Sequence, residues 1–411
     1  MINATLNLYK NAYSGLTRNV WLLSIVMLVN RSGTMVLAFL TLYCKHLGYS
    51  TEQGGWVVAI YGLGSIAGAL IGGKLSDVFG FYRIQFAALF FGGILFMVLG
   101  QMKGYAAICI CVFILSMVNE AFRPANASAI AHYSNKQNRT QSFSLVRLAI
   151  NLGWGVGIAV GGLLASIDYH LLFWVDGCTN VFAALTLLVI LPKVSVAGTK
   201  KPADTSGETT NILKTGSALK DRQFLYFLFM IVLFGLCFFQ VFTTVPLYMN
   251  EVLHLNESSI GIVMAVNGIM IALFEMLLVY KLEGKRTYLY LITVGTIMMA
   301  LSFLLLNLPI ANGFMVALLA VLLLTIAEMV AMPFMNSYYI SKSPDHRRGQ
   351  YAGLYTMAWS IAQVVGSSGG AITADKIGYT NLWWIVAGIC GIASIGFYKL
   401  HGIHQNKNPA L

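Results

Sequence analysis

Charged residues are scarce in this 411-residue chain: Asp, Glu, Lys and Arg together make up 10% of it, whereas apolar residues make up 58%. Soluble domains carry about 25% charged and about 45–50% apolar residues. So few charges do not cover the water-facing surface of a chain this long. The composition therefore excludes a cytosolic enzyme, a disordered protein and a secreted disulfide scaffold, and it predicts a protein with many membrane spans.

Cysteine is also used sparingly, and the six cysteines lie within or at the ends of apolar runs: Cys44, Cys109, Cys111, Cys178, Cys237 and Cys390. The sequence has no Cys-x-x-Cys pair and no His/Cys spacing typical of zinc ligands, so we expect neither disulfides nor a metal site. We also expect no cleavable signal peptide, because residues 1–18 are mostly polar and the apolar stretch that follows is long enough to span a membrane.

Acidic residues are few, 15 against 26 Lys and Arg, which gives a formal charge of +11. The basic residues occur singly or in pairs rather than in runs, so we interpret them as charges that set membrane topology and expect no nucleic-acid partner. The sequence also has no Gly-Lys-Ser/Thr nucleotide loop and no Ser/His/Asp arrangement. We therefore expect neither ATP-driven transport nor an enzyme.

Twelve apolar runs are long enough to cross a bilayer as helices, which needs roughly 20 residues each: 19–44, 53–75, 84–102, 105–131, 140–166, 169–191, 222–249, 257–280, 286–306, 313–341, 347–373 and 380–400. One long hydrophilic stretch, 193–221, separates the sixth run from the seventh. The pattern predicts an all-α membrane protein of two six-helix bundles, 1–192 and 222–411, joined by a cytoplasmic linker.

Lys and Arg residues fall mostly in the loops on one side of this arrangement, and we assign that side to the cytoplasm. Only Lys45, Lys103 and Lys376 then lie in loops on the outer side. Twelve crossings return the chain to its starting side, so we expect both termini in the cytoplasm.

The two halves repeat each other in sequence. Pro124 and Pro333 are separated by the same number of residues as Arg139 and Arg348, and each Pro/Arg pair surrounds the loop between two consecutive spans. Repeated halves are typical of secondary transporters whose substrate site lies near the midplane, between the halves. We therefore expect pseudo-twofold symmetry between the bundles.

The end of the second run reads GKLSDVFGFYR, from Gly73 to Arg83. It resembles the loop motif Gly-x-Leu-Ala-Asp-Arg-x-Gly-Arg-Arg of the major facilitator superfamily. In this chain Val78 follows the aspartate, and Arg83 is the one basic residue that remains of the final Arg-Arg pair. The resemblance implies that fold for the whole chain. It also implies that Asp77 acts in gating by facing the start of the eleventh helix when the inner gate is shut, and Arg83 belongs to the same motif.

Seven charged residues lie inside the predicted spans, where each is costly and therefore informative: Arg31, Glu120, Arg123, Arg147, Asp176, Glu275 and Glu328. Asp176 and Glu275 fall near predicted helix ends, where an interfacial position is expected. Arg31 lies mid-span without an acid nearby in sequence. It is predicted to face either the substrate cavity or an acid on another helix.

Glu120 and Arg123 are three residues apart on one helical face, and Arg147 lies at a similar depth on the next, antiparallel helix. We expect these three to form one cluster, with Arg123 and Arg147 in gating. Two interpretations stay open: a structural latch, or an anion or proton-coupling site that includes Glu120.

Glu328 is the strongest candidate for proton coupling, because it lies mid-span with no base nearby in sequence. A carboxyl group in such a setting favours its protonated form. Arg31 is expected to approach it across the cavity in one conformation, and the alternative is that Glu328 only packs between helices. Five aromatic residues are candidates to line that cavity: Tyr61, Trp154, Tyr248, Tyr338 and Trp359.

The fifth run carries Gly153, Gly157, Gly161 and Gly162, with Ile158 after the second glycine. This resembles the antiporter-associated motif Gly-x-x-x-Gly-Pro-x-x-Gly-Gly of drug:proton exporters, and small residues at this spacing also permit close helix packing. By contrast, the segment 122–128, Glu328, and the stretch 30–33 resemble parts of proton-coupled oligopeptide transporters.

Together these features predict a secondary active transporter that exports small amphipathic organic compounds by alternating access. Two alternatives stay open, proton-coupled uptake of peptides or another small nutrient and lipid flipping. We expect no cofactor, a proton gradient as the energy source, a small-molecule substrate and a lipid bilayer as partners, a monomer, and a location in a bacterial-type plasma membrane.

Overall fold

The computed structural model describes residues 2–192, 218–308 and 312–407. The described residues form α-helices and short 3-10 turns, with no strand among them. The N-terminal half contains α1 (Ile2–Tyr13), α2 (Arg18–Ser32), α3 (Val36–His46), α4 (Thr51–Phe79), α5 (Phe81–Leu99), α6 (Tyr105–Glu120), α7 (Phe122–Tyr133), α8 (Arg139–Ile167) and α9 (Tyr169–Ile190).

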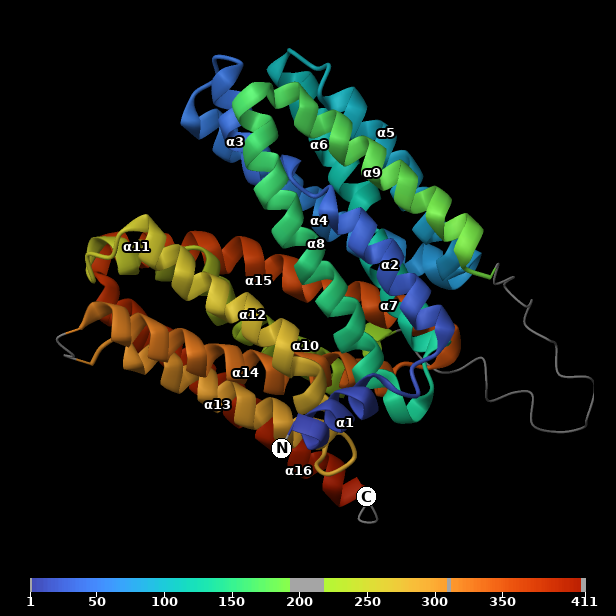
Figure 1. Cartoon of the computed structure of the whole chain (residues 1–411), viewed down its shortest axis with the longest axis vertical. Helices are drawn as coiled ribbons and strands as arrows, with labels where there is room; N and C mark the ends of the chain where they lie inside the picture. The colour runs from blue at the N-terminus through green and yellow to red at the C-terminus, as the bar shows by residue number, and fades with distance from the viewer. Residues whose placement is uncertain (1, 193–217, 309–311, 408–411) are drawn as a thin grey trace, which may run out of the picture.

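The C-terminal half contains α10 (Arg222–Phe238), the 3-10 turn η4 (Phe239–Phe242), α11 (Thr244–Glu251), α12 (Glu257–Leu282), α13 (Tyr288–Leu305), α14 (Gly313–Lys342), α15 (Arg348–Ile377) and α16 (Tyr379–Lys407). Figure 1 shows two helical bundles, α2 to α9 and α10 to α16, that meet near α7 and diverge toward α3 and α11. The all-helical, two-bundle prediction is confirmed.

Ten helices within the described residues are long and apolar enough to cross a membrane, or up to eleven if a bent pair counts as one span. The predicted run 347–373 corresponds to α15, and the run 19–44 corresponds to α2 and α3 together. The count of twelve therefore stays a prediction, as does the cytoplasmic location of the termini, which Figure 1 places at the same end of the molecule. Most of the predicted linker, 193–217, lies outside the described residues.

The first predicted span is broken between α2 and α3. Gly33 ends α2, and a Cβ there would lie 1.7 Å from the Thr179 Oγ1 of α9. Asp176, also on α9, accepts hydrogen bonds from the backbone N–H groups of Met35 (3.3 Å) and Val36 (3.0 Å). A buried carboxylate therefore caps the N-terminus of α3, which satisfies donors that the break leaves free.

The two bundles make close backbone contact at one end, here called the closed end. A Cβ at Gly73 of α4 would lie 2.5 Å from the carbonyl oxygen of Gly349, and one at Gly353 of α15 would lie 2.6 Å from that of Ala69. Only glycine permits helices to approach this closely. The Lys and Arg distribution predicts that this end faces the cytoplasm.

At the opposite end, here called the open end, α8 and α15 pack along one narrow stripe each. Between residues 152 and 163, α8 is buried only at Gly153, Gly157 and Gly161. Between 361 and 370, α15 is buried only at Ala362, Gly366 and Gly370, the equivalent positions of the repeat. The α8 stripe packs on α2 and α3, and the α15 stripe packs on α10 and η4. The remaining faces of both helices are at least partly exposed, so the two bundles pack less closely here than at the closed end.

The N-terminal helix α1 bridges the bundles near the closed end. It bends by 90° from α2. The Tyr9 hydroxyl donates to the Leu273 carbonyl of α12 (3.0 Å), and Gln141 of α8 donates to the Ala12 carbonyl (3.4 Å). These contacts add to the cross-bundle packing at this end.

Candidate functional site

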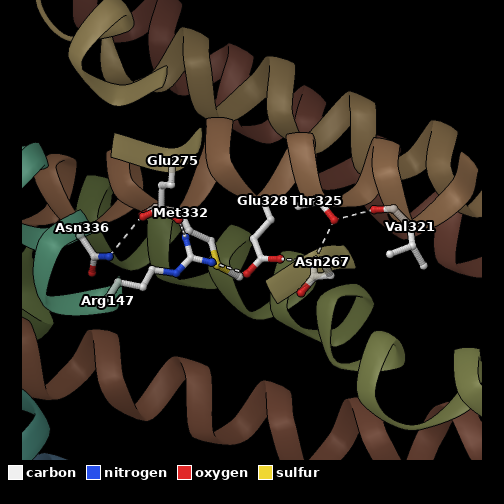
Figure 2. Close-up of polar contacts among 8 residues, drawn as sticks. All are labelled: Arg147, Asn267, Glu275, Val321, Thr325, Glu328, Met332 and Asn336. Atoms are coloured by element: carbon white, nitrogen blue, oxygen red, sulfur yellow. Dashed lines mark hydrogen bonds and ion pairs between the residues drawn. The ribbon is translucent and has the colours of Figure 1, made fainter. Parts of the chain in front are cut away.

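Arg147 of α8 lies between two carboxylates of the other bundle. Its Nη1 donates to Glu275 Oε2 on α12 (2.9 Å), and its Nη2 donates to Glu328 Oε1 on α14. Figure 2 shows the guanidinium between the two glutamates. The acidic side chains are 3% and 7% exposed and the arginine 16%, so this charge cluster is largely shielded from water.

A polar side chain holds Glu328 from its other side. Asn267 of α12 donates from Nδ2 to Glu328 Oε2 (3.3 Å) and to the Thr325 hydroxyl (2.9 Å), which in turn donates to the Val321 carbonyl (2.6 Å). These bonds orient the Glu328 carboxylate toward Arg147, as Figure 2 shows. We call Arg147, Glu275, Glu328 and Asn267 the coupling cluster.

The coupling cluster has one arginine for two carboxylates. With both glutamates ionised, one negative charge is left over in a poorly hydrated setting, which is unfavourable. One bound proton, or one bound monovalent cation, would neutralise it. The arginine keeps its own proton at any working pH, so the exchangeable charge lies on the glutamates.

Two sequence-based predictions about this region are wrong. Arg147 does not complete a cluster with Glu120, because α8 directs this residue toward α12 and α14. In this conformation Glu328 pairs with Arg147, and the approach of Arg31 to Glu328 in another conformation stays a prediction. Glu275 is not interfacial, since it is 2% exposed in the ion pair. Helical rise gives the depth of a residue, whereas packing decides which way it faces.

A second polar region lies within the N-terminal bundle. Arg123 donates to Glu120 Oε2 (3.3 Å), which confirms that pair. The charges of Glu120, Arg123 and Asp176 act on Arg31, whose Nε has no hydrogen-bond partner among the described residues. Asp176 itself is 1% exposed, so the prediction of an interfacial position for it is wrong.

Asp77 lies at the closed end as the sequence motif implies. Its Oδ1 accepts from the Gly349 N–H (2.6 Å) and its Oδ2 from the Gln350 N–H (2.7 Å). Both donors belong to the first turn of α15, in the other bundle, where the helix dipole favours a carboxylate. Arg83, the other motif residue, is exposed in the first turn of α5.

Glu283 makes the equivalent contact from the other half, a contact that no feature used above predicts. It follows α12, and its Oε1 accepts from the Thr140 N–H in the first turn of α8 (3.3 Å). Burial raises the pKa of Glu283 above its usual range, while the hydrogen bonds from Thr140 act in the opposite direction. The stretch Leu282-Glu283-Gly284 occupies the place of the Asp77 loop in the second half, and this position could have indicated that Glu283 caps a helix.

The glycine motif of α8 packs as predicted at three of its four positions. A Cβ at Gly153 would lie 2.7 Å from the Arg31 Cβ, one at Gly157 3.0 Å from the Arg31 carbonyl oxygen, and one at Gly161 2.7 Å from the Met35 Cβ. The prediction is wrong for Gly162, where a Cβ would meet nothing within 4 Å.

The five aromatic candidates separate into two groups. Tyr248 donates to the Leu306 carbonyl (2.6 Å) and Tyr338 packs on Phe227 (ring centroids 4.6 Å apart), both inside the C-terminal bundle. The prediction that they line a substrate cavity between the bundles is therefore wrong, and Tyr338 instead borders a separate cavity within the C-terminal bundle.

The other three aromatic candidates remain predictions. Tyr61 is half-buried and interacts electrostatically with Arg31 and Glu120. Trp154 is 43% exposed, with its ring centroid 6.3 Å from that of Phe242 in the other bundle. Trp359 is half-buried against Phe238.

Within the described residues, no group of three or more His, Cys, Asp or Glu side chains is placed to hold a metal ion. The charged clusters of this molecule are instead ion pairs and helix caps, several of which join the two bundles.

Known proteins resemble this chain along most of its length. A Na⁺, Li⁺, K⁺/H⁺ antiporter of Planococcus maritimus is 23% identical, with 92% of this chain and 93% of the relative covered. Multidrug resistance protein 2 of Bacillus subtilis is 22% identical, with 92% and 93% covered. The crystal structure of a bacterial homologue of the iron transporter ferroportin, in an outward-facing state, aligns with a TM-score of 0.74 at 15% identity, covering 94% of this chain and 100% of the other.

The sequence model of the Major Facilitator Superfamily matches residues 20–367, which is most of the chain. The match includes the Asp77 loop, the glycine stripe of α8 and the coupling cluster. The protein is therefore a multi-pass membrane transporter that belongs to the Major Facilitator Superfamily.

Proposed function

We propose that this protein exports small amphipathic organic compounds in exchange for protons, and that Glu275 and Glu328 carry the exchanged proton. The observation that supports this is the sharing of Arg147 by two buried carboxylates of the opposite bundle. We further propose that it works as a monomer in a bacterial-type plasma membrane, without a cofactor.

The coupling cluster links protonation to gating in this proposal. Its two ion pairs join α8 to α12 and α14 and therefore stabilise the closed end. A proton on either glutamate removes one ion pair, which lowers the cost of separating the bundles at that end. Once the closed end opens to the cytoplasm, the proton leaves and the carboxylate recovers Arg147 as the end closes again.

The choice of an organic substrate rests on the named activities of relatives, since multidrug resistance protein 2 covers nearly the whole chain. The exposed apolar side chains of α8 at the open end, including Leu152, Trp154 and Val156, would suit such a substrate. Uptake of peptides and lipid flipping have less support from the relatives named above.

Exchange of a monovalent cation for protons is a second candidate. The P. maritimus antiporter matches nearly the whole chain. Besides its two carboxylates, the coupling cluster offers the oxygen of Asn267, next to the Thr325 hydroxyl, and oxygen ligands suit hard cations. In this mechanism a cation and a proton compete for the same carboxylates.

The experiment is transport in proteoliposomes with a pH gradient as the only energy source. Wild-type protein should concentrate an organic cationic dye on the side from which protons leave. Glu328→Gln and Glu275→Gln should still exchange dye for dye across the membrane but should not concentrate it. Asp375→Asn, at an exposed acid in the last turn of α15, is the matched control and should behave as wild type.

Dye accumulation by both Gln variants would exclude the coupling cluster as the proton carrier, and Glu120 would be tested next. Proton movement driven by Na⁺ or K⁺ gradients, without any dye accumulation, would instead favour cation exchange.

A further inference from the structure

A cavity of about 660 Å³ opens where α13, α14 and α16 end on the side of the closed end. Its lining contains four basic residues, Lys285, Arg286, Lys342 and His401, and no acidic residue. No residue of the coupling cluster lines it. A basic concave site of this size calls for an anionic ligand.

The walls of the cavity are organised around those basic groups. The Arg286 guanidinium lies 5.6 Å from the Tyr290 ring centroid, and the Lys342 ammonium lies 5.8 Å from that of Tyr338. The His401 Nδ1 lies 3.1 Å from the Thr287 hydroxyl. These contacts hold the bases in place around the first turn of the 18-residue helix α13, whose N–H groups also favour an anion.

The cavity adjoins apolar surface that continues along the membrane-spanning helices. The His401 ring lies 6.4 Å from both Tyr290 and Tyr398, which are 39% and 62% exposed. Exposed Ile297 and Leu301 continue along α13 from Tyr290, and exposed Ile395 and Ile392 continue along α16 from Tyr398. Tyrosines at this position are typical of the membrane–water interface.

We propose that this cavity binds the phosphate of an anionic phospholipid headgroup, with the acyl chains along the exposed faces of α13 and α16. The bases, the α13 N-terminus and the phosphate share one site at the interface, and basic pockets between spanning helices on the cytoplasmic side suit anionic headgroups. A free phosphate ion would use the same bases but would gain nothing from the apolar surface beside them.

The test measures lipid binding by the full chain in detergent, by native mass spectrometry, with phosphatidylglycerol as the probe. Arg286→Gln/Lys342→Gln should bind it about 30-fold more weakly, since each basic residue near an anionic headgroup contributes about 1 kcal/mol. Lys281→Gln/Lys399→Gln removes two exposed bases close to the cavity but outside its lining and should bind as wild type. Phosphatidylcholine should bind weakly to all three proteins.

Equal loss of phosphatidylglycerol binding in the two double variants would overturn the proposal, because general surface charge would then explain it. Displacement of the lipid by millimolar inorganic phosphate would also overturn it, in favour of a free-anion site. If Arg286→Gln/Lys342→Gln does not fold, the single variant Lys285→Gln provides the same comparison against Lys281→Gln. The assay needs no transport, so its outcome is independent of the proposed function.

Discussion

Arg147 connects the two bundles through two hydrogen-bonded ion pairs. It is the only base bound to Glu275 and Glu328 among the described residues, and all three side chains are largely buried. Removing one partner from a buried ion pair typically costs about 3–5 kcal/mol, because the remaining charge is left without compensation. We therefore expect Arg147→Gln to lower the melting temperature of the purified protein strongly.

A second substitution should restore part of that stability. In Arg147→Gln/Glu328→Gln only Glu275 keeps its charge, so the repulsion between the acids is gone. Arg83→Gln serves as the control, because Arg83 is exposed, and it should melt as wild type does. If neither Glu328→Gln nor Glu275→Gln raises the melting temperature of Arg147→Gln, the three residues do not form one charge cluster in the membrane.

Among the secondary-structure elements, two helix caps stabilise the contact between the bundles at the closed end. Asp77 caps α15 and Glu283 caps α8, each from the opposite bundle. A charge at a partly buried helix N-terminus is worth about 1–2 kcal/mol, which corresponds to about a 5- to 30-fold change in population. Asp77→Asn and Glu283→Gln should each favour opening of this end, and the double variant should do so more.

The measurement is the distance between spin labels at Arg83→Cys and Lys285→Cys, two exposed positions on opposite bundles near the closed end. The exposed Cys178 would be replaced by serine to avoid extra labelling. Both neutral variants should increase the population with long distances. Glu251→Gln, an exposed acid at the end of α11, should not. Unchanged distances in the double variant would argue against gating by these caps.

The glycine contacts between α4 and α15 give a steric prediction for the same end. In Gly73→Ala the new Cβ would lie 2.5 Å from the Gly349 carbonyl oxygen, so the helices have to separate. Overpacking of this kind costs about 1–3 kcal/mol. Gly155→Ala on α8 adds the same group where nothing lies within 4 Å. We expect Gly73→Ala, but not Gly155→Ala, to lengthen the spin-label distances, and equal effects would contradict the close approach.

Alternating access by the whole molecule requires the closed end to open in each cycle. Thr140 of α8 and Ser337 of α14 lie on opposite bundles there, with their hydroxyl oxygens 2.6 Å apart. Side chains this close bring two Cβ atoms near the separation that a disulfide needs. Thr140→Cys/Ser337→Cys should therefore cross-link under oxidising conditions and stop transport, and a reductant should restore it.

The single variants Thr140→Cys and Ser337→Cys control for the loss of each hydroxyl, and both should transport with or without oxidant. Continued transport by the fully cross-linked protein would show that the bundles need not separate at this point during the cycle.

The helical membrane fold, the two halves and the contact of Asp77 with the start of α15 could be predicted from the sequence, whereas gating by Asp77 stays a prediction. Each depends on local properties: the length of apolar runs, the repeated spacing of Pro124 with Pro333, and a motif whose carboxylate needs a helix N-terminus. Predicted spans agree closely with the helices, as for 140–166 and α8, because burying a backbone in lipid requires a helix over that length.

Which charged residues meet depends on how the helices pack in three dimensions, and the sequence did not predict it. Arg147, Glu275 and Glu328 come from three helices in two bundles, and their sequence separations contain no information about the direction in which each side chain points. That direction follows from how α8 packs: its glycines turn one face toward α2 and α3, and Arg147 is left facing α12 and α14. A buried charge has to find a partner, but packing between the bundles selects the partner.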